Sequence, residues 1–196
     1  MRLYDSAISG NSYKVRLCAA QLGVPLEIAP VDILRGESRT PEFLRMNPNG
    51  RTPLLEDDGF VLAESNAILA YLARGTRLLP DDHRRWALVF QWLFFEQYSH
   101  EPFIATSRFW LLHKPAGPER DAAIGARRDG GLAALRVMDG HLATRAFFVD
   151  EYSIADIALF AYTHVSHEGG FTLDEVPHVR TWLDRVRAQP GFVAMG

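Results

Sequence analysis

The sequence predicts two domains, an α+β domain followed by an all-α helical bundle. Short apolar runs alternate with helical stripes over residues 1–76, which is typical of mixed strands and helices. Beyond Arg84 the strand patterns nearly vanish and long helical patterns take over. Of the 196 residues, 47% are hydrophobic and 23% are charged, an ordinary globular balance with ample material for a core. We therefore expect domains at 1–76 and 85–196, joined by a linker at 77–84.

The first domain begins with a strand, a helix and a second strand. Residues 2–4 form the short first strand, and the apolar residues of 13–22 fall on one helical stripe. Gly23 and Pro25 end that helix, since both are usual stop signals. Residues 26–33 then alternate in a way that predicts the second strand.

A short helix, a hairpin and a further helix complete the first domain. Thr40 precedes the short helix at 41–46 as its cap, with proline at the first helical position. The apolar runs 54–56 and 60–62 flank an Asp-Asp-Gly turn whose residues tolerate positive φ, which indicates a hairpin. Residues 67–72 form the last helix of the domain.

The second domain is predicted to consist of helices at 84–113, 118–144, 154–167 and 179–187. Ser153 and Asp156 form the pattern of a capping box at the start of the third of these helices. The serine hydroxyl and the carboxylate there satisfy free backbone amides. We assign Asp156 this structural role and no catalytic role.

Charge and cysteine content exclude several classes of protein. The net charge is −3, so the chain lacks the strong positive field typical of nucleic acid binding. No apolar run approaches the length of a membrane span, and the first residues show no signal-peptide pattern. The single cysteine, Cys18, excludes an intramolecular disulfide and a cysteine-based metal cluster, and His164 and His167 have no evident third ligand. We therefore expect a cytoplasmic protein with no metal site and no nucleic acid or membrane partner.

A loop that leads into the first helix carries small polar residues. Ser9, Asn11 and Ser12 lie beside the amide-rich, electropositive start of that helix, where an anion is favoured. The same residues also suit simple capping of the helix, so the loop alone leaves both interpretations open.

Two further segments of the first domain suit a ligand that resembles an amino acid. A cis bond between Thr52 and Pro53 would turn the amide and carbonyl of Thr52 outward for pairing with a peptide, although the general preference is for trans. Ser65 begins a helix, so its hydroxyl and the following amides can receive a carboxylate, and Glu64 can receive an ammonium group. The alternative is that Ser65 is only a cap and Glu64 only a favourable charge at the helix start.

These motifs, taken in order, resemble those of the cytosolic glutathione transferases of the bacterial type with a serine in the first loop. The resemblance covers nearly the whole chain and includes the capping box at Ser153–Asp156. It implies a thioredoxin-like first domain, an all-helical second domain and a homodimer. It also implies that glutathione is a co-substrate and that no cofactor is permanently bound.

The resemblance assigns parts of glutathione to the motifs. The backbone groups of Thr52, beside the family's cis-proline at Pro53, would pair with the cysteinyl part. Glu64 and Ser65 would hold the γ-glutamyl ammonium and carboxylate. The glycyl carboxylate has two candidate partners, Arg51 and, more loosely, Arg39.

Ser9 aligns with the hydroxyl that donates to the glutathione sulfur in serine-type members. A free thiol with a pKa of about 8.5 is little ionised at neutral pH, and a hydroxyl donor near a helix start favours the thiolate. Tyr4 is a rival, because other members use a tyrosine near the chain start, but it lies in the predicted strand. Asn11 and Ser12 stay open as alternatives for the sulfur contact. The loop has no cysteine, which disfavours disulfide exchange.

The resemblance implies transfer of an alkyl or aryl group to glutathione from a small hydrophobic electrophile, as in detoxification. We expect the electrophile site between the domains, with candidate residues at His100, Phe103, Ser107 and Trp110. Each of these side chains suits the core or a dimer surface equally well. A glutathione-dependent isomerase or dehalogenase is an alternative, as is a non-catalytic glutathione- or ligand-binding protein on the same fold.

Overall fold

The computed structural model describes residues 1–195, which divide into two compact units. One unit consists of Met1–Arg77 together with the chain from Gln189 onward, and the other consists of Leu78–Ala188. The division differs from the predicted one at both boundaries. Most of the predicted linker belongs to the helical unit, and the residues that follow the last helix belong to the first unit.

Contacts between residues far apart in the sequence account for this difference. Leu78 has no exposed surface, and its carbonyl accepts a hydrogen bond of 3.0 Å from the amide of Ile154. The chain after Arg77 is therefore part of the helical unit. Near the other end, Tyr13 Oη donates to the carbonyl of Val193 at 2.7 Å within the first unit.

The first unit contains a four-stranded mixed sheet in the order β2-β1-β3-β4. Its strands are β1 (Arg2–Asp5), β2 (Glu27–Pro30), β3 (Leu54–Asp57) and β4 (Phe60–Ala63). β1 and β2 run parallel, whereas β1 with β3 and β3 with β4 are antiparallel. The predicted hairpin is confirmed, and Asp58 and Gly59 in its turn have positive φ.

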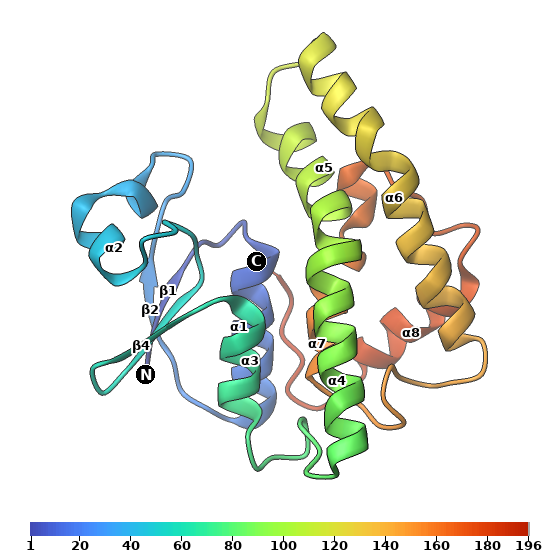
Figure 1. Ribbon diagram of the computed structural model, residues 1–196, viewed down its shortest axis with the longest axis horizontal. Helices are drawn as coiled ribbons and strands as arrows, with labels where there is room; N and C mark the ends of the chain where they lie inside the picture. Colours follow the sequence, from blue (N-terminus) through green and yellow to red (C-terminus); the bar gives the residue numbers. More distant parts are fainter. Residues whose placement is uncertain (196) are drawn as a thin grey trace. The chain divides into compact units, whose positions relative to one another are not determined.

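Helices cover both faces of this sheet, with α1 and α3 on one side and α2 on the other (Figure 1). The helical segments are α1 (Gly10–Leu22), the 3₁₀ turn η1 (Glu37–Arg39), α2 (Pro41–Met46) and α3 (Ser65–Ala73). On the α2 side, Tyr4 and Leu54 pair across β1 and β3 and pack with Phe43 of α2. Because both faces are covered, the consecutive residues Leu54 and Leu55 are both fully buried.

Specific side chains and turns fix the ends of the predicted helices. α1 ends at Gly23, which has a φ of 67° in the left-handed region that glycine adopts without strain. The amide of Phe43 donates to Thr40 Oγ1 at 3.3 Å, and Pro41 occupies the first position of α2 as predicted. α3 begins at Ser65, as predicted from the Glu64–Ser65 motif that precedes its apolar residues.

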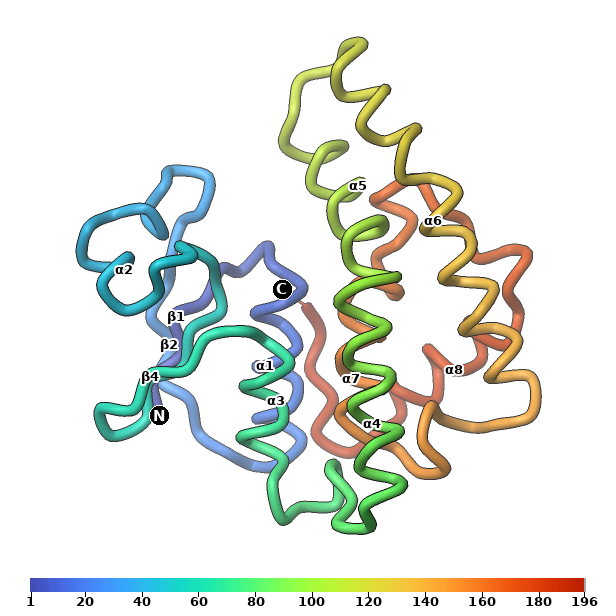
Figure 2. The backbone as a smooth tube through the Cα atoms, viewed as in Figure 1, coloured from blue at the N-terminus to red at the C-terminus, as the bar shows by residue number. Residues whose placement is uncertain are grey.

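The second unit is helical, as predicted. Its segments are α4 (His83–Phe95), η2 (Glu96–His100), α5 (Glu101–His113), α6 (Pro118–Leu142), α7 (Ile154–Thr163), the 3₁₀ turn η3 (Ser166–Gly169) and α8 (Pro177–Arg187). Figure 2 shows α4 continuing through η2, a π-helical segment, into α5. Every residue of α7 is buried, and the predicted capping box of Ser153 and Asp156 is confirmed at its start.

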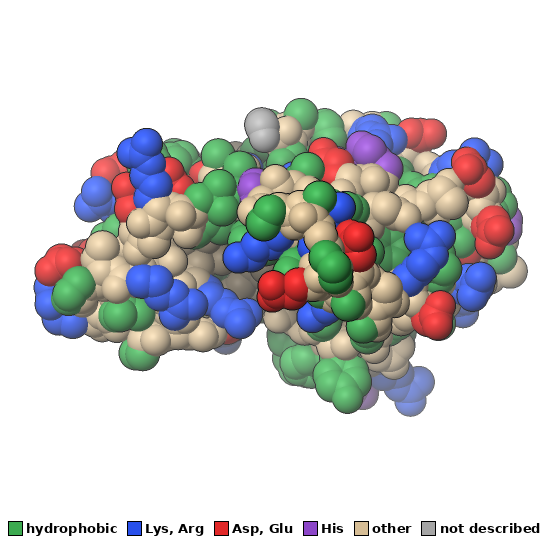
Figure 3. All heavy atoms as spheres, turned by 90° about the horizontal axis from the view of Figure 1, so that it is seen from above, with side chains coloured by type: hydrophobic (Ala, Val, Ile, Leu, Met, Phe, Trp, Pro, Cys, Tyr) green, Lys and Arg blue, Asp and Glu red, His purple; other side chains and the backbone are tan. Residues whose placement is uncertain are grey.

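Basic and acidic side chains are interspersed on the face drawn in Figure 3. None of the helices in the described chain combines the length and the apolarity of a membrane span. Within residues 1–195, no three His, Cys, Asp or Glu side chains gather as metal ligands would. His164 has a packing role instead, because its Nδ1 donates to the Phe160 carbonyl at 2.9 Å and its ring stacks on the Phe160 ring.

Candidate functional site

The start of α1 carries the serine predicted to contact a thiol. Ser9 is the N-cap, and the amide of Ser12 donates to Ser9 Oγ at 3.3 Å. Ser12 is fully buried, and its Oγ accepts the amide of Ser6 at 3.2 Å. Ser9 is only partly buried, so its hydroxyl is the more accessible of the two. Accepting the Ser12 amide occupies a lone pair of Ser9 Oγ and leaves its hydrogen available for donation.

A chain of hydrogen bonds joins the starts of α1 and α3. Ser65, the first residue of α3, donates from Oγ to Asn11 Oδ1 at 3.1 Å. Lys14 Nζ donates to the same Ser65 Oγ at 3.4 Å. Two predicted candidates from separate segments, Asn11 and Ser65, are thus brought together at the positive ends of two helices. Such a place favours an anionic ligand group.

Lys14 is a residue of this cluster that the sequence pattern does not single out. Its side chain has no exposed surface. It lies three residues after Asn11, so both side chains lie on the same face of α1. Lys14 could have been identified as a lysine within a helix that is mostly buried, because lysine is rarely buried without a specific partner.

The motif around Thr52 and Glu64 has an unusual backbone. The Thr52–Pro53 bond is cis, so the general preference for trans is wrong here and the resemblance to the family gives the right isomer. Glu64 has a φ of 70°, a left-handed value that is uncommon for a residue other than glycine. The Glu64 side chain is exposed directly before Ser65. A positive φ at a residue other than glycine is often found at functional sites.

The two candidate arginines lie on the surface of the first unit. Arg39 is exposed, and its Nη1 donates to the carbonyl of Asn49 at 3.0 Å. Arg51 is also exposed, and its carbonyl is held by Asn47 Nδ2 at 2.8 Å. Within residues 1–195, no hydrogen bond joins Arg39 or Arg51 to Ser65.

Tyr4 and Cys18 are unsuited to thiol chemistry at this site. Tyr4 Oη donates to Glu56 Oε2 at 3.0 Å in the sheet. Partial burial and this bond to Glu56 raise the pKa of Tyr4. Because the bond to Glu56 uses the single hydroxyl hydrogen of Tyr4, it favours Ser9 over Tyr4 as the donor. Cys18 is fully buried, and burial raises the pKa of its thiol to about 12, so it stays protonated and inert.

His100 and Ser107, two of the residues predicted for the electrophile site, are buried in the structure. Neither has any exposed surface. Thr163 Oγ1 donates to the carbonyl of Leu159 at 2.7 Å, so His100 Nε2 donates to Thr163 Oγ1 at 2.9 Å. Both polar side chains are therefore interior residues of the helical unit.

Phe103 and Trp110 of α5 keep partial exposure. The Phe103 ring packs against Gly130 of α6, where a Cβ atom would lie 2.4 Å from the ring. Trp110 lines a hollow of about 420 Å³ at the turn between α5 and α6. Lys114 lies over the Trp110 ring there, with Nζ 5.9 Å from the ring centre.

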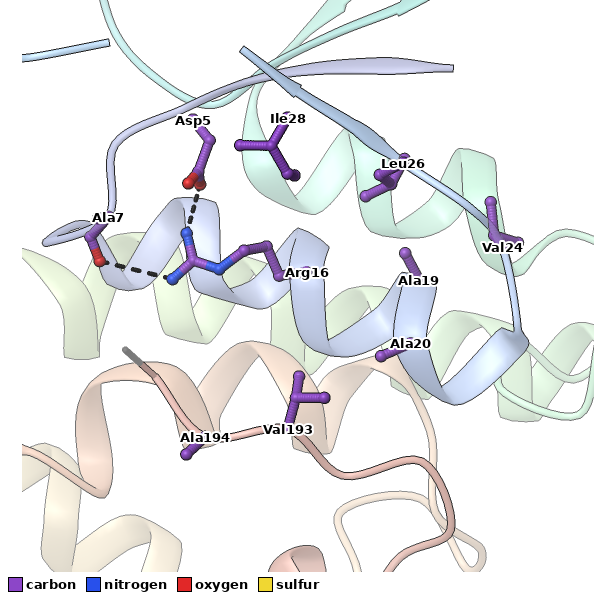
Figure 4. A pocket seen from close by; sticks show the side chains of 10 residues that line it. All are labelled: Asp5, Ala7, Arg16, Ala19, Ala20, Val24, Leu26, Ile28, Val193 and Ala194. Carbon is purple, nitrogen blue, oxygen red and sulfur yellow. Dashed lines mark hydrogen bonds and ion pairs between the residues drawn. The ribbon is translucent and has the colours of Figure 1, made fainter. Parts of the chain in front are cut away.

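A second hollow, of about 530 Å³, lies beside α1 in the first unit (Figure 4). Its lining is mostly apolar, and the Arg16 side chain crosses one end, paired with Asp5 and 3.5 Å from the carbonyl of Ala7. Asp5 is the last residue of β1, and Ala7 lies in the loop that carries Ser9. The Arg16 contacts therefore fix this loop between β1 and α1.

Comparisons with known proteins show the family of this chain. Residues 1–74 match the family described as glutathione S-transferase, N-terminal domain, and residues 92–190 match glutathione S-transferase, C-terminal domain. The chain is 34% identical to glutathione S-transferase 3 of Zea mays over 203 residues, covering 98% of this chain and 91% of that one.

Two bacterial crystal structures are similar over nearly the whole chain. The glutathione S-transferase from Pseudomonas fluorescens shares 47% identity with a TM-score of 0.96, covering 99% of this chain and 98% of that one. A possible glutathione S-transferase from Rhodopseudomonas palustris shares 50% identity with a TM-score of 0.95, covering 99% and 89%. The predicted fold class and the predicted family are both confirmed. The chain belongs to the glutathione S-transferase family.

Proposed function

We propose that the protein binds glutathione, holds its sulfur as a thiolate and transfers it to a small hydrophobic electrophile. The observation that carries this proposal is the accessible Ser9 hydroxyl at the start of α1, in the loop next to the Asn11–Ser65 bond. A hydroxyl that donates to sulfur beside a helix start stabilises the thiolate over the thiol. Lowering a thiol pKa by about two units corresponds to about 2.7 kcal/mol of differential stabilisation.

The remaining contacts follow from the charges of glutathione. Ser65 and the free amides at the start of α3 would receive the γ-glutamyl carboxylate, and the exposed Glu64 carboxylate would receive the ammonium group. The backbone of Thr52 would pair with the cysteinyl part. Arg51, or more loosely Arg39, would bind the glycyl carboxylate, for which an exposed guanidinium is suited.

The second substrate and the assembly are part of the same proposal. Phe103 and Trp110 are the predicted electrophile residues that retain some exposure, and aromatic side chains suit an apolar substrate. We propose that the protein is a cytoplasmic homodimer and that exposed aromatic residues of α4 and η2 form part of its interface.

Calorimetric titration with reduced glutathione and with S-hexylglutathione tests the proposal. We expect saturable binding of both ligands, with tighter binding of S-hexylglutathione because its hexyl chain occupies an apolar site next to sulfur. Ser65→Ala is expected to weaken both ligands, since both carry the γ-glutamyl carboxylate. Turnover of glutathione with electron-poor aryl halides then tests the transfer step. A folded protein that binds neither ligand would leave a scaffold without glutathione chemistry.

A further inference from the structure

Lys14 is a fully buried lysine in the second turn of α1. Long side chains on a helix lean toward its N-terminus, so the Lys14 ammonium group is directed toward the end where Ser9 and Asn11 lie. Its Nζ is 3.4 Å from Ser65 Oγ. The proposed contacts with glutathione assign no role to Lys14, so its burial needs a separate explanation.

The hydrogen-bond chemistry of lysine fixes the direction of the bonds in this cluster. An ammonium group can only donate, so Ser65 Oγ is the acceptor in the bond with Lys14. A serine hydroxyl has one hydrogen, and Ser65 donates it to Asn11 Oδ1 at 3.1 Å. The bonds therefore run in one direction, from Lys14 to Ser65 to Asn11. With Lys14 in place, Ser65 presents its hydrogen at the start of α3.

We infer that Lys14 is a positioning residue that prepares Ser65 as a donor to the γ-glutamyl carboxylate of glutathione. This inference rests on the proposed function. In the structure the Ser65 hydroxyl donates to Asn11 Oδ1. When glutathione binds, a carboxylate oxygen of the ligand would replace Asn11 Oδ1 as the acceptor. The starts of two helices add electrostatic attraction for the same carboxylate. The arrangement favours a ligand with this carboxylate over one without it.

The test compares glutathione with 4-aminobutanoyl-cysteinyl-glycine, which lacks only the α-carboxylate of the γ-glutamyl part. Calorimetric titration of both ligands is performed with the wild type, Lys14→Met, Ser65→Ala and the double variant. We expect Lys14→Met to weaken glutathione binding about ten-fold, the effect of a hydrogen bond with a charged partner, and to leave the analogue nearly unchanged. In the Ser65→Ala background, Lys14→Met is expected to have little further effect, because Lys14 acts through Ser65.

Lys14→Arg and Lys14→Gln provide the comparison if Lys14→Met does not fold. Arginine only donates and is expected to keep the preference for glutathione, whereas glutamine can also accept and is expected to reduce it. Equal weakening of both ligands, or additive effects of Lys14→Met and Ser65→Ala, would show a merely structural role and overturn the inference. Wild-type affinity of Lys14→Met for glutathione would overturn it while the proposed function stands. Absence of glutathione binding by the wild type would overturn both.

Discussion

Ser9 illustrates how one hydroxyl can serve the fold and the proposed chemistry together. Its Oγ accepts the Ser12 amide and so satisfies one of the free donors at the start of α1. This uses a lone pair of Oγ and leaves the hydrogen for a sulfur atom. The two roles are separable by mutation, because a cap needs an acceptor or a flexible backbone, whereas a thiolate needs a donor.

Replacing Ser9 by alanine and by glycine separates these roles. We expect both variants to bind glutathione but to raise the pKa of the bound thiol, which is measured from thiolate absorbance across a pH titration. Ser9→Ala is expected to lower the free energy of unfolding by about 1 kcal/mol through loss of the cap, and Ser9→Gly by only a few tenths, about 0.3 kcal/mol. An unchanged thiol pKa in both variants would remove Ser9 from the proposed role and favour Asn11.

Asp156 gives a prediction about the pH dependence of stability. Its Oδ1 accepts the amide of Phe148 at 3.2 Å and Trp182 Nε1 at 2.9 Å, while its Oδ2 accepts from Ser153. Burial nevertheless raises the pKa of this carboxyl to about 7, because desolvation penalises the charged form. The folded protein therefore holds this proton more tightly than the unfolded chain, where the carboxyl pKa is about 3.9.

Between pH 4 and 7, the Asp156 term should make the free energy of unfolding fall as pH rises, by up to about 1.4 kcal/mol per pH unit. Asp156→Asn removes this term and also leaves the Ser153 amide facing a donor, so the variant is less stable throughout. We expect the difference between wild type and Asp156→Asn in urea unfolding to be larger at pH 5 than at pH 7.5.

Asp82 supplies a control for this pH effect. It caps α4, and its bond with the backbone amide of Arg85 lowers the pKa of the Asp82 carboxyl. The carboxyl therefore titrates below this pH range. The difference between wild type and Asp82→Asn should stay constant from pH 5 to pH 7.5. A constant difference for Asp156→Asn as well would mean that Asp156 has an ordinary pKa.

At the scale of elements, alanine substitutions at two glycines of α6 distinguish the effect of close packing on stability from the effect of helix propensity. A Cβ atom at Gly131 would lie 2.3 Å from the Phe171 ring, whereas nothing lies within 4 Å of one at Gly140. Glycine costs a helix interior about 1 kcal/mol relative to alanine. Gly140→Ala is therefore expected to raise the free energy of unfolding by up to about 1 kcal/mol. Gly131→Ala is expected to lower it by about 1–3 kcal/mol, because the ring must move.

Urea unfolding of the two variants beside the wild type measures both changes. Gly125→Ala is a second control in the same helix, since a Cβ atom there also meets open space. A stabilising effect of Gly131→Ala equal to that of Gly140→Ala would contradict the close packing of Phe171 on α6.

Most elements could be predicted from the sequence because their signals are local. Thr40 and Pro41 mark the start of α2, and Gly23 marks the end of α1, since caps and left-handed residues are properties of a few neighbours. The π-helical segment Glu96–His100 has no such signal, and its sequence reads as a continuation of the helix. The cis bond before Pro53 is likewise set by its surroundings, and only the family resemblance indicated it.

The candidate site was predictable in its segments but not in its connections. The motifs placed Asn11 and Ser65 near helix starts, yet the bond between them depends on how α1 and α3 pack. The role of Lys14 follows from the same packing. The burial of His100 and Ser107 could not be predicted, because a polar residue on a mostly apolar helix gives the same pattern whether it faces a ligand or the core.

At the scale of the whole molecule, the chain passes through the helical unit and returns to the first. The segment after Ala188 packs on α1, where Tyr13 Oη holds the carbonyl of Val193. Gly191 has a φ of 73°, and a Cβ atom there would lie 2.9 Å from the carbonyl oxygen of Ala20. Such a close approach between distant segments leaves no periodic pattern, which is why the predicted second domain included these residues.

The prediction that the protein forms a homodimer is based on the aromatic surface of α4 and η2. Trp86, Phe90, Phe94 and Tyr98 follow one another at every fourth position, so they form one stripe along the helix. The exposed fraction is 67% for Phe94 and 85% for Tyr98. An apolar stripe in which Trp86, Phe94 and Tyr98 are exposed is typical of an interface with another protein, and a second copy of the chain is the proposed partner.

Sedimentation velocity measures this association directly. We expect the wild type to sediment with twice the mass of one chain, and the double variant Phe94→Lys, Tyr98→Lys to sediment as a monomer, because charges without partners are costly at a buried interface. Val137→Lys is the matched control, since Val137 is 52% exposed on α6, outside the stripe, and its replacement should leave the dimer intact. A dimer that survives the double variant would place the interface elsewhere. A monomeric wild type at micromolar concentration would contradict the proposed homodimer, because interfaces of stable dimers resist dissociation in that range.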